Sequence, residues 1–375
     1  MRGRVLTISA IALALATGGF TLRYRDGDQS VAVGPAPTVV DMVTITTAAP
    51  TTTEPPTTSP STVPPTTKAR VTTTRATRPT VTAPKAQPAA AVKPVSPSPS
   101  ESASGLPASF AGLGTWVDVF DFNPAHTNGQ PPAVSPATVD TMADAGVRTL
   151  YLQSARPNDP LAPGDLVSPD LLAQFLTRAH ARGMRVVAWY LPHFADVSDD
   201  MRHLSAMLAF KANGRGFDGI GLDIEWRAAV PDAAARGAQL VELSRQLNAA
   251  AGALPVGAIV LPPVVTDVIN PAYWPGFPWE SIKPYYDAWL PMGYWTNRRA
   301  GTPDRDAYHH TTDNIRLLRQ HLGDVPIHFV GGIGNAATAA DYAGFVQALA
   351  ENGIAGRSIY DWATTGAGPM AALKG

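Results

Sequence analysis

The chain has no cysteine among its 375 residues, which excludes disulfides, thiolate metal sites and a cysteine nucleophile. It also has no strong excess of one charge, because the formal net charge is -1 at pH 7. No long basic run occurs after residue 105. We therefore expect no nucleic acid among its partners.

Several catalytic signatures are missing as well. No second histidine stands at zinc-ligand spacing from His193, and the pair His309-His310 has no obvious acidic partner. A Gly-x-Ser-x-Gly elbow, which would indicate a serine hydrolase, is absent. The glycines of Gly331-Gly332-Ile333-Gly334 come too late in the chain for a dinucleotide-binding loop. The sequence predicts neither a metal nor a cofactor.

Residues 1-25 have the pattern of an export signal. A basic start, Met1-Arg2-Gly3-Arg4, precedes an apolar run from Val5 to about Leu15, and Ala14-Leu15-Ala16 fits a cleavage site. Apolar and small residues continue to Leu22, so an uncleaved membrane anchor is the alternative. Both interpretations predict an extracytoplasmic protein of the cell envelope, secreted or anchored to the membrane.

Residues 26-105 are expected to be a disordered linker. From about Val39 to Ser104 the chain consists mainly of Thr, Pro, Ala and Ser, without a periodic apolar face. Such a segment cannot bury enough apolar surface to offset the entropy of ordering it. The composition changes near Leu106, and we place the folded domain at 106-375.

In the folded domain, strand and helix patterns alternate. Helix signals occur at 171–181, 200–212, 232–251, 312–321 and 339–351. The expected strands are 115–122, 147–153, 185–191, 219–225, 256–261, 288–294, 327–332 and 357–362. Eight such units in about 270 residues predict an α/β fold, a (β/α)8 TIM barrel. A doubly wound open sheet is the alternative.

The fourth expected strand carries two acids on one face. Side chains of a strand alternate, so Gly219, Gly221, Asp223 and Glu225 share a face. Two inward carboxyl groups are costly to bury, and a structural role explains them only through ion pairs or a complete hydrogen-bond network. Two carboxyl groups at the end of a strand are what the cleavage of a glycosidic bond requires.

Barrel enzymes build their sites at the carboxyl ends of the strands. The candidate substrate-binding residues at these ends are Asp118, Asp121, Gln153, Tyr190, Trp226, Trp295, Asn297, Asp361 and Trp362. On a continuous strand, Asp118 and Asp121 have opposite parity, so only one of them is expected to face inward. Each aromatic residue alone is explained by packing under a loop. Together, the aromatic and acidic residues at one end favour a sugar-binding site.

One stretch resembles a known motif. Asp218-Gly219-Ile220-Gly221-Leu222-Asp223-Ile224-Glu225 resembles the Asp-Gly-x-Asp-x-Asp-x-Glu motif of glycoside hydrolase family 18, the chitinase-like barrels, with Gly221 in place of the middle aspartate. Met292-Gly293-Tyr294 is similar to that family's Met-x-Tyr on strand six, although Trp295 stands where an aspartate is usual. Trp362 resembles the tryptophan that forms the floor of its sugar subsite.

The resemblance implies an exported hydrolase of N-acetylated polysaccharide, either chitin-like or the glycan of peptidoglycan. Glu225 would protonate the leaving oxygen while the N-acetyl oxygen of the substrate attacks the anomeric carbon. Asp223 would orient the acetamido group, and Tyr294 would donate a hydrogen bond to it. When two carboxyl groups lie close together, the negative charge of one raises the pKa of the other. We therefore expect Glu225 to stay protonated while Asp223 ionises.

Other interpretations stay open at this point. An inverting enzyme could use Asp118, Asp121 or Asp361 as its base. The missing middle aspartate supports a catalytically inactive sugar-binding barrel of the cell envelope, and a third alternative is an envelope scaffold whose linker is the functional part. The intact pair Asp223 and Glu225 favours an enzyme, which we expect to be a monomeric barrel with a glycan as its partner.

Overall fold

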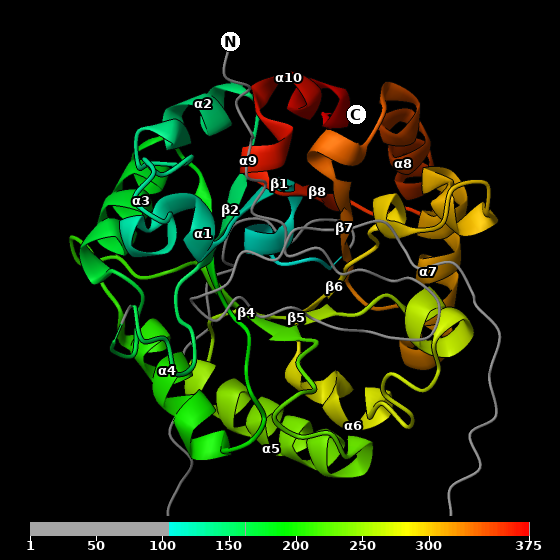
Figure 1. Ribbon diagram of the computed structural model, residues 1–375, viewed down its shortest axis with the longest axis horizontal. Coiled ribbons are helices and arrows are strands. Elements are labelled where there is room, and N and C mark those ends of the chain that lie inside the picture. Colours follow the sequence, from blue (N-terminus) through cyan, green and yellow to red (C-terminus); the bar gives the residue numbers. More distant parts are fainter. Residues whose placement is uncertain (1–104, 162, 375) are drawn as a thin grey trace, which may run out of the picture. The chain divides into compact units, whose positions relative to one another are not determined.

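The computed structural model describes residues 105–161 and 163–374 (Figure 1). The predicted signal or anchor at 1-25 and the predicted linker at 26-105 lie outside the described residues, apart from Gly105. Within the described part, no helix is long and apolar enough to cross a membrane.

Eight parallel strands form one sheet in the order β6-β5-β4-β3-β2-β1-β8-β7. Their bounds are β1 Gly112–Val117, β2 Thr149–Gln153, β3 Arg185–Tyr190, β4 Gly219–Ile224, β5 Val256–Val260, β6 Ala288–Pro291, β7 His328–Ile333 and β8 Gly356–Tyr360. Parallel bridges from Trp289 to Ile327 and from Met292 to Val330 bring β6 beside β7 and close the ring. The predicted (β/α)8 barrel is confirmed.

Helices surround the strands, as Figure 1 shows. They are α2 Thr138–Asp144, α3 Pro169–Ala181, α4 Val197–Ala209, α5 Ala233–Ala251, α6 Trp279–Ile282, α7 Ala307–Leu322, α8 Ala339–Glu351 and α10 Ala367–Met370. The short helices α1 (Val119–Phe122) and α9 (Trp362–Thr365) directly follow β1 and β8. Side-chain caps begin several helices: Asp306 accepts a hydrogen bond from the backbone N–H of His309, and Thr338 from that of Asp341.

The first and last strands end earlier than the sequence predicts. The expected strand 115–122 ends at Val117, because the Asp118 side chain accepts hydrogen bonds from the backbone N–H groups of Phe120 and Asp121 and begins α1. The expected strand 357–362 ends at Tyr360, because Asp361 caps α9 in the same way. An aspartate that bonds the backbone two or three residues ahead competes with strand geometry.

Aromatic side chains fill the barrel interior. The ring of Trp116 on β1 stacks on Tyr151 of β2 at 4.2 Å and meets Trp189 of β3 edge-on at 6.2 Å. Gly221 on β4 leaves room for its neighbours on the two adjacent strands, since a Cβ there would lie 2.9 Å from Cδ1 of Ile259 and 3.3 Å from Cβ of Trp189. The face of β4 that carries its glycines is therefore the inward one, as the sequence predicts.

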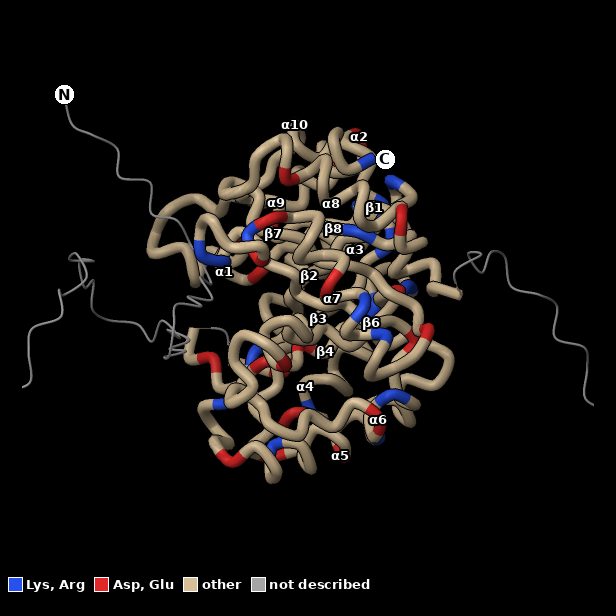
Figure 2. The backbone as a smooth tube through the Cα atoms, turned by 90° about the vertical axis from the view of Figure 1, so that its right-hand side faces the viewer, with Lys and Arg blue, Asp and Glu red and all other residues tan. Residues whose placement is uncertain are grey.

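Charged side chains on the outside of the barrel are mixed in sign. Lys and Arg positions are interspersed with Asp and Glu positions along the backbone of the barrel (Figure 2). Arg245 pairs with Glu242 at 2.6 Å on α5, and Arg316 pairs with Asp313 at 3.3 Å on α7. Exposed pairs of this kind stabilise a fold little. They contrast with the buried charges of a single sign described below.

A substitution at Gly334, in the turn after β7, tests how tightly the last two units pack. A Cβ at this position would lie 2.7 Å from the Cα of Thr365 in α9. Gly334→Ala is expected to lower the free energy of unfolding by about 1–3 kcal/mol because the backbone must shift. Gly368→Ala is the control, since a Cβ there meets nothing within 4 Å. Equal urea midpoints for the two variants would contradict this packing.

Candidate active site

Two buried carboxyl groups lie at the carboxyl end of β4. Asp223 is paired with Ile259 of β5 in the strand register, and Glu225 follows one residue beyond the strand. Only 8% of Asp223 and 5% of Glu225 is exposed. Among the described residues, Oδ1 of Asp223 has no hydrogen-bond partner. The buried network that a structural role would require is therefore incomplete.

The pKa values of both carboxyl groups in this pair are raised. Burial raises the pKa of Glu225 to about 7, and burial together with the charge of Glu225 raises the pKa of Asp223 well above its usual range. The order differs from the expectation that Asp223 ionises first, because both burial and the neighbouring charge oppose an anionic Asp223. Above about pH 7, the pair thus carries one proton between two carboxyl groups.

A second acidic group lies where β1 and β8 end. Asp118, Asp121 and Asp361 are all buried, and each offers an oxygen within 4.8 Å of the others. The hydroxyl of Tyr360 donates to Oδ2 of Asp118 at 2.8 Å. The expectation that Asp118 and Asp121 point to different faces fails because the chain turns into α1 after Val117. We call these three aspartates the acidic trio.

Like charges and burial raise the pKa values within the acidic trio. Burial and the charges of Asp118 and Asp361 raise the pKa of Asp121 to about 10. Burial and the charge of Asp118 raise the pKa of Asp361 to about 6. Carboxylate oxygens are the ligands that Mg²⁺ and Ca²⁺ prefer, so the trio is also the place in the described chain where a metal could be held. That the protein uses no metal stays a prediction.

Tyr294 connects the two acidic groups. Its pKa is raised by burial and by the charges of Glu225, Asp223, Asp361 and Asp118. Its ring lies 5.8 Å from that of Tyr360. In the sheet order, β4 and β8 are separated by three strands along either path, so they lie on opposite sides of the ring (Figure 1). Tyr294 is thus within electrostatic reach of carboxyl groups from both sides.

Three more predicted residues lie at strand ends near these groups. Oε1 of Gln153, at the end of β2, accepts a hydrogen bond from the backbone N–H of Val119 at 3.1 Å and so holds α1 in place. Trp226 follows Glu225 and stacks on His193 with ring centroids 5.5 Å apart. Trp362 is the first residue of α9, directly after Asp361, and is buried.

Two of the predicted substrate-binding residues contact the outer helices instead of the acidic groups. The Tyr190 hydroxyl donates to Asp200 of α4 at 2.6 Å, and its ring stacks on His203. Trp189 occupies the inward face of β3, which leaves Tyr190 on the outward face. Trp295 is fully buried with its ring 4.9 Å from that of Phe345 in α8.

Asn297 ends the short turn Trp295–Asn297 that follows β6. Its side-chain amide nitrogen is buried and has no hydrogen-bond partner among the described residues.

Two further tyrosines lie at the site; the sequence places Tyr273 only in an aromatic loop after the fifth expected strand and does not indicate Tyr360. Tyr360 donates to Asp118, and the Tyr273 hydroxyl donates to the backbone oxygen of Glu225 at 2.7 Å. Tyr360 could have been found by counting alternate residues of its strand from Ser358, whose hydroxyl accepts from Trp116 inside the barrel. Tyr273 lies in an irregular loop, where no periodic signal is available.

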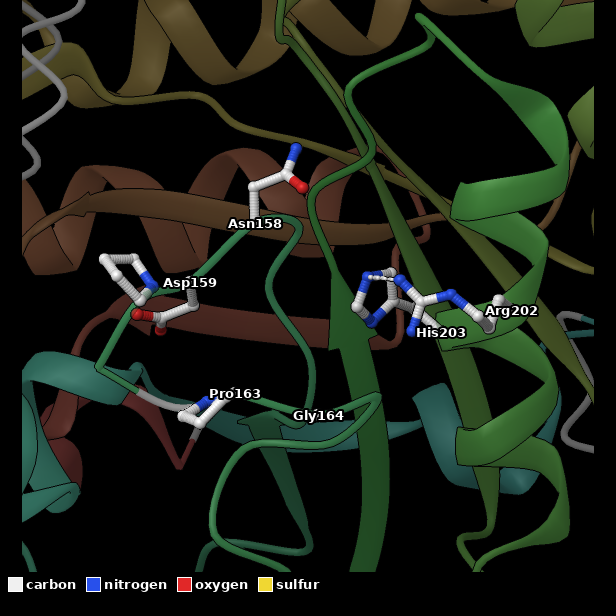
Figure 3. Close-up of a pocket in the computed structure, with 7 residues that line it drawn as sticks. Asn158, Asp159, Pro163, Gly164, Arg202 and His203 are labelled. Atoms are coloured by element: carbon white, nitrogen blue, oxygen red, sulfur yellow. Dashed lines mark hydrogen bonds between the residues drawn. The ribbon is translucent and has the colours of Figure 1, made fainter.

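A separate hollow of about 330 Å³ lies between the loop after β2 and helix α4 (Figure 3). Its lining residues are Asn158, Asp159, Pro160, Pro163, Gly164, Arg202 and His203. The acid in this hollow, Asp159, is bound to His126 at 2.8 Å and to Arg156 at 3.4 Å. It has no second carboxyl group in the lining, so we place the candidate chemistry at the barrel mouth instead.

No protein-family model matches the chain, and no curated protein is similar to it in sequence. Solved structures do resemble it. An endo-1,4-β-mannanase from Rhizomucor miehei has a TM-score of 0.52 at 9% identity, with 70% of this chain and 93% of that one covered. A class V chitinase from Pseudomonas fluorescens Pf-5 has a TM-score of 0.51 at 11% identity, with coverage of 70% and 98%.

A GH18 chitinase from Pseudoalteromonas aurantia is similar at a TM-score of 0.50 and 14% identity, covering 70% of this chain and 99% of that chain. What is shared is the fold. Chitinases of family 18 and other glycosidases are thus among the structural neighbours of this (β/α)8 barrel.

Proposed function

We propose that the chain is an exported glycoside hydrolase that cleaves an N-acetylated polysaccharide, chitin-like or the glycan of peptidoglycan. The main support is the buried pair Asp223 and Glu225 at the end of β4, which shares one proton above about pH 7. A group that gives up a proton near the working pH is suited to general acid catalysis. The chitinases and the mannanase among similar structures show that this fold can carry glycan hydrolysis.

The chemistry proceeds in two steps. The proton of the Glu225 carboxyl moves to the glycosidic oxygen as the bond to the anomeric carbon breaks, and the acetamido oxygen of the substrate forms a new bond to that carbon. Water then attacks the same carbon and gives its proton to the Glu225 carboxylate, while the acetamido oxygen leaves. Two displacements at one carbon retain its configuration.

Asp223 and Tyr294 serve the acetamido group. When the N–H of that group approaches the unpartnered Oδ1 of Asp223, the hydrogen bond favours the ionised form and leaves the shared proton on Glu225. The carboxylate then stabilises the positive charge that develops on the acetamido group. The Tyr294 hydroxyl donates a hydrogen bond to the acetamido oxygen.

Hydrolysis of N-acetylglucosamine oligomers and of purified peptidoglycan glycan by the full chain tests the proposal. New reducing ends with the configuration of the original linkage, followed by proton NMR, are the expected result. Inversion would assign the base role to an aspartate of the acidic trio instead. Binding without cleavage would support the second candidate, an inactive sugar-binding barrel, which Gly221 in place of the middle aspartate favours.

Trp362 is proposed to support the bound sugar. Trp362 directly follows Asp361 at the start of α9, and a tryptophan face beside a glycan site can stack on a sugar ring. Trp362→Ala is expected to weaken oligosaccharide binding by about 1–3 kcal/mol. Titration calorimetry checks this, with Trp362→Phe as the matched variant that keeps part of the ring face. An unchanged affinity in a folded Trp362→Ala protein would remove this residue from the site.

We also propose that residues 1-25 direct export and that 26-105 connects the barrel to the cell envelope. The basic start and apolar run support export, and the composition of the linker supports an extended connection. The barrel is proposed to act as a monomer.

A further inference from the structure

Glu225 lies one residue beyond the regular part of β4. The register pairs between β4 and β5 end at Ile224 and Val260, so the peptide that follows Glu225 is outside the ladder of the sheet. A general acid has to keep its proton within hydrogen-bond reach of the leaving oxygen, and a shift of this peptide carries the side chain with it. The peptide after Glu225 therefore needs a support from outside the ladder.

The hydroxyl of Tyr273, in the loop after β5, supplies this support. It donates a hydrogen bond of 2.7 Å to the backbone oxygen of Glu225. Tyr273 is buried, and burial together with the charge of Glu225 raises the pKa of its hydroxyl. The hydroxyl therefore keeps its proton and stays a donor at neutral pH. If the bond only satisfied a buried carbonyl, Tyr273 itself would not need to be fixed.

Tyr273 is in fact fixed by Arg236 of α5. Nη2 of Arg236 donates to the backbone oxygen of Tyr273 at 3.2 Å, and Nη1 donates to that of Val230 at 2.6 Å. The guanidinium also lies 4.1 Å from the ring centroid of Trp274. Arginine can hold two segments at once because its donors form a rigid planar fork. Arg236, which is buried, thus ties the loop after β5 to the loop after β4.

The same peptide is held from the loop after β3 as well. Trp226, the next residue after Glu225, stacks its ring on His193 with centroids 5.5 Å apart. The backbone N–H of His193 donates to Asp200 of α4 at 3.0 Å. Since β3 and β5 flank β4 in the sheet, the loops on both sides of β4 meet at the peptide that carries the acid.

We propose that Tyr273 is a positioning residue for the general acid and that Arg236 acts through it. The hydrogen bond from the Tyr273 hydroxyl holds the peptide after Glu225, so that the Glu225 carboxyl stays directed at the leaving oxygen. This inference rests on the proposed glycosidase function. Within it, Tyr273 and Arg236 touch neither the sugar nor the transferred proton, and their effect is confined to the step that Glu225 performs.

Tyr273→Phe is the deciding variant because it removes the hydroxyl and keeps the ring. We expect kcat on the N-acetylated glycan to fall about tenfold with KM unchanged, since the lost bond orients the acid and does not bind the glycan. On an aryl glycoside, whose leaving group hardly needs a proton, the loss should stay below about twofold. Steady-state kinetics of the full chain on the two substrates measure this difference.

Tyr286→Phe is the matched control. The Tyr286 hydroxyl is also buried and is hydrogen-bonded to that of Ser244 at 2.7 Å. Tyr286 precedes β6, however, and so lies at the amino end of the strands, away from the mouth. The same chemical change there should leave both rates unaltered, even if it lowers the urea midpoint as much as Tyr273→Phe does.

A double variant with Glu225→Gln separates positioning from a general effect on the fold. If Tyr273 acts through the acid, Tyr273→Phe should cause no further loss of kcat once the acid is gone. A scaffold role would lower the rate of Glu225→Gln by the same factor as that of the wild type. Arg236→Lys keeps the charge without the fork, so it should reproduce the selective loss on the glycan.

Several results would overturn the inference. They are an unchanged kcat in a folded Tyr273→Phe protein, equal losses on both substrates, or a further loss in the double variant. If neither Tyr273→Phe nor Arg236→Lys folds, the two residues serve the fold itself and the positioning role is rejected. In each case, glycan cleavage by the wild type leaves the proposed function standing. If the wild type cleaves no glycan, the proposed function fails and this inference fails with it.

Discussion

Glu225→Gln is expected to lower turnover on a polysaccharide at least about 100-fold, because glutamine keeps the shape of the side chain but cannot give a proton to the leaving oxygen. The loss should be smaller on an aryl glycoside, whose leaving group hardly needs a proton. Comparing kcat on the two substrates therefore separates loss of the acid from a general disturbance of the site.

Glu280→Gln is the matched control for this experiment. Glu280 lies on α6 and is exposed, so the same chemical change there should leave both rates unaltered. If wild type cleaves the glycan and Glu225→Gln cleaves it at the same rate, Glu225 is not the acid. A loss of equal size on both substrates would assign Glu225 a positioning role.

The sequence predicts most of the barrel because its signals are local. β4 is expected at 219–225 and observed at Gly219–Ile224, and α5 is expected at 232–251 and observed at Ala233–Ala251. The errors lie at the ends of β1 and β8. There, Asp118 and Asp361 bond to backbone N–H groups ahead of them, and hydrophobic periodicity carries no information about such caps.

The sequence also predicts part of the candidate site, again from a local signal. Side-chain parity identifies Asp223 and Glu225 correctly as an inward pair, because β4 is regular up to its end. The same parity excludes Tyr190 from the barrel interior, because its neighbour Trp189 occupies the inward face of β3. The meeting of Asp118, Asp121 and Asp361 depends on two helices that begin side by side after adjacent strands, which only the tertiary structure shows.

Asp223→Asn is expected to lower the rates on both substrates by about 100-fold or more, because it removes the charge that stabilises the acetamido group in the transition state. Unlike the loss in Glu225→Gln, this one does not depend on the leaving group. A polysaccharide and an aryl glycoside should therefore be affected alike. A strong dependence on the leaving group would contradict the assigned role of Asp223.

The pH dependence of the residual activity should also reverse in Asp223→Asn. In the wild type, the pKa of Glu225 is raised to about 7 and that of Asp223 lies well above its usual range, so the state with one shared proton forms as the pH rises through about 7. Activity should rise with it. In the variant, Glu225 titrates alone, and its protonated form exists below its pKa, which burial still raises. Residual kcat/KM should therefore fall as the pH rises through about 7, and a profile that keeps the direction of the wild type would show that the two carboxyl groups do not share a proton.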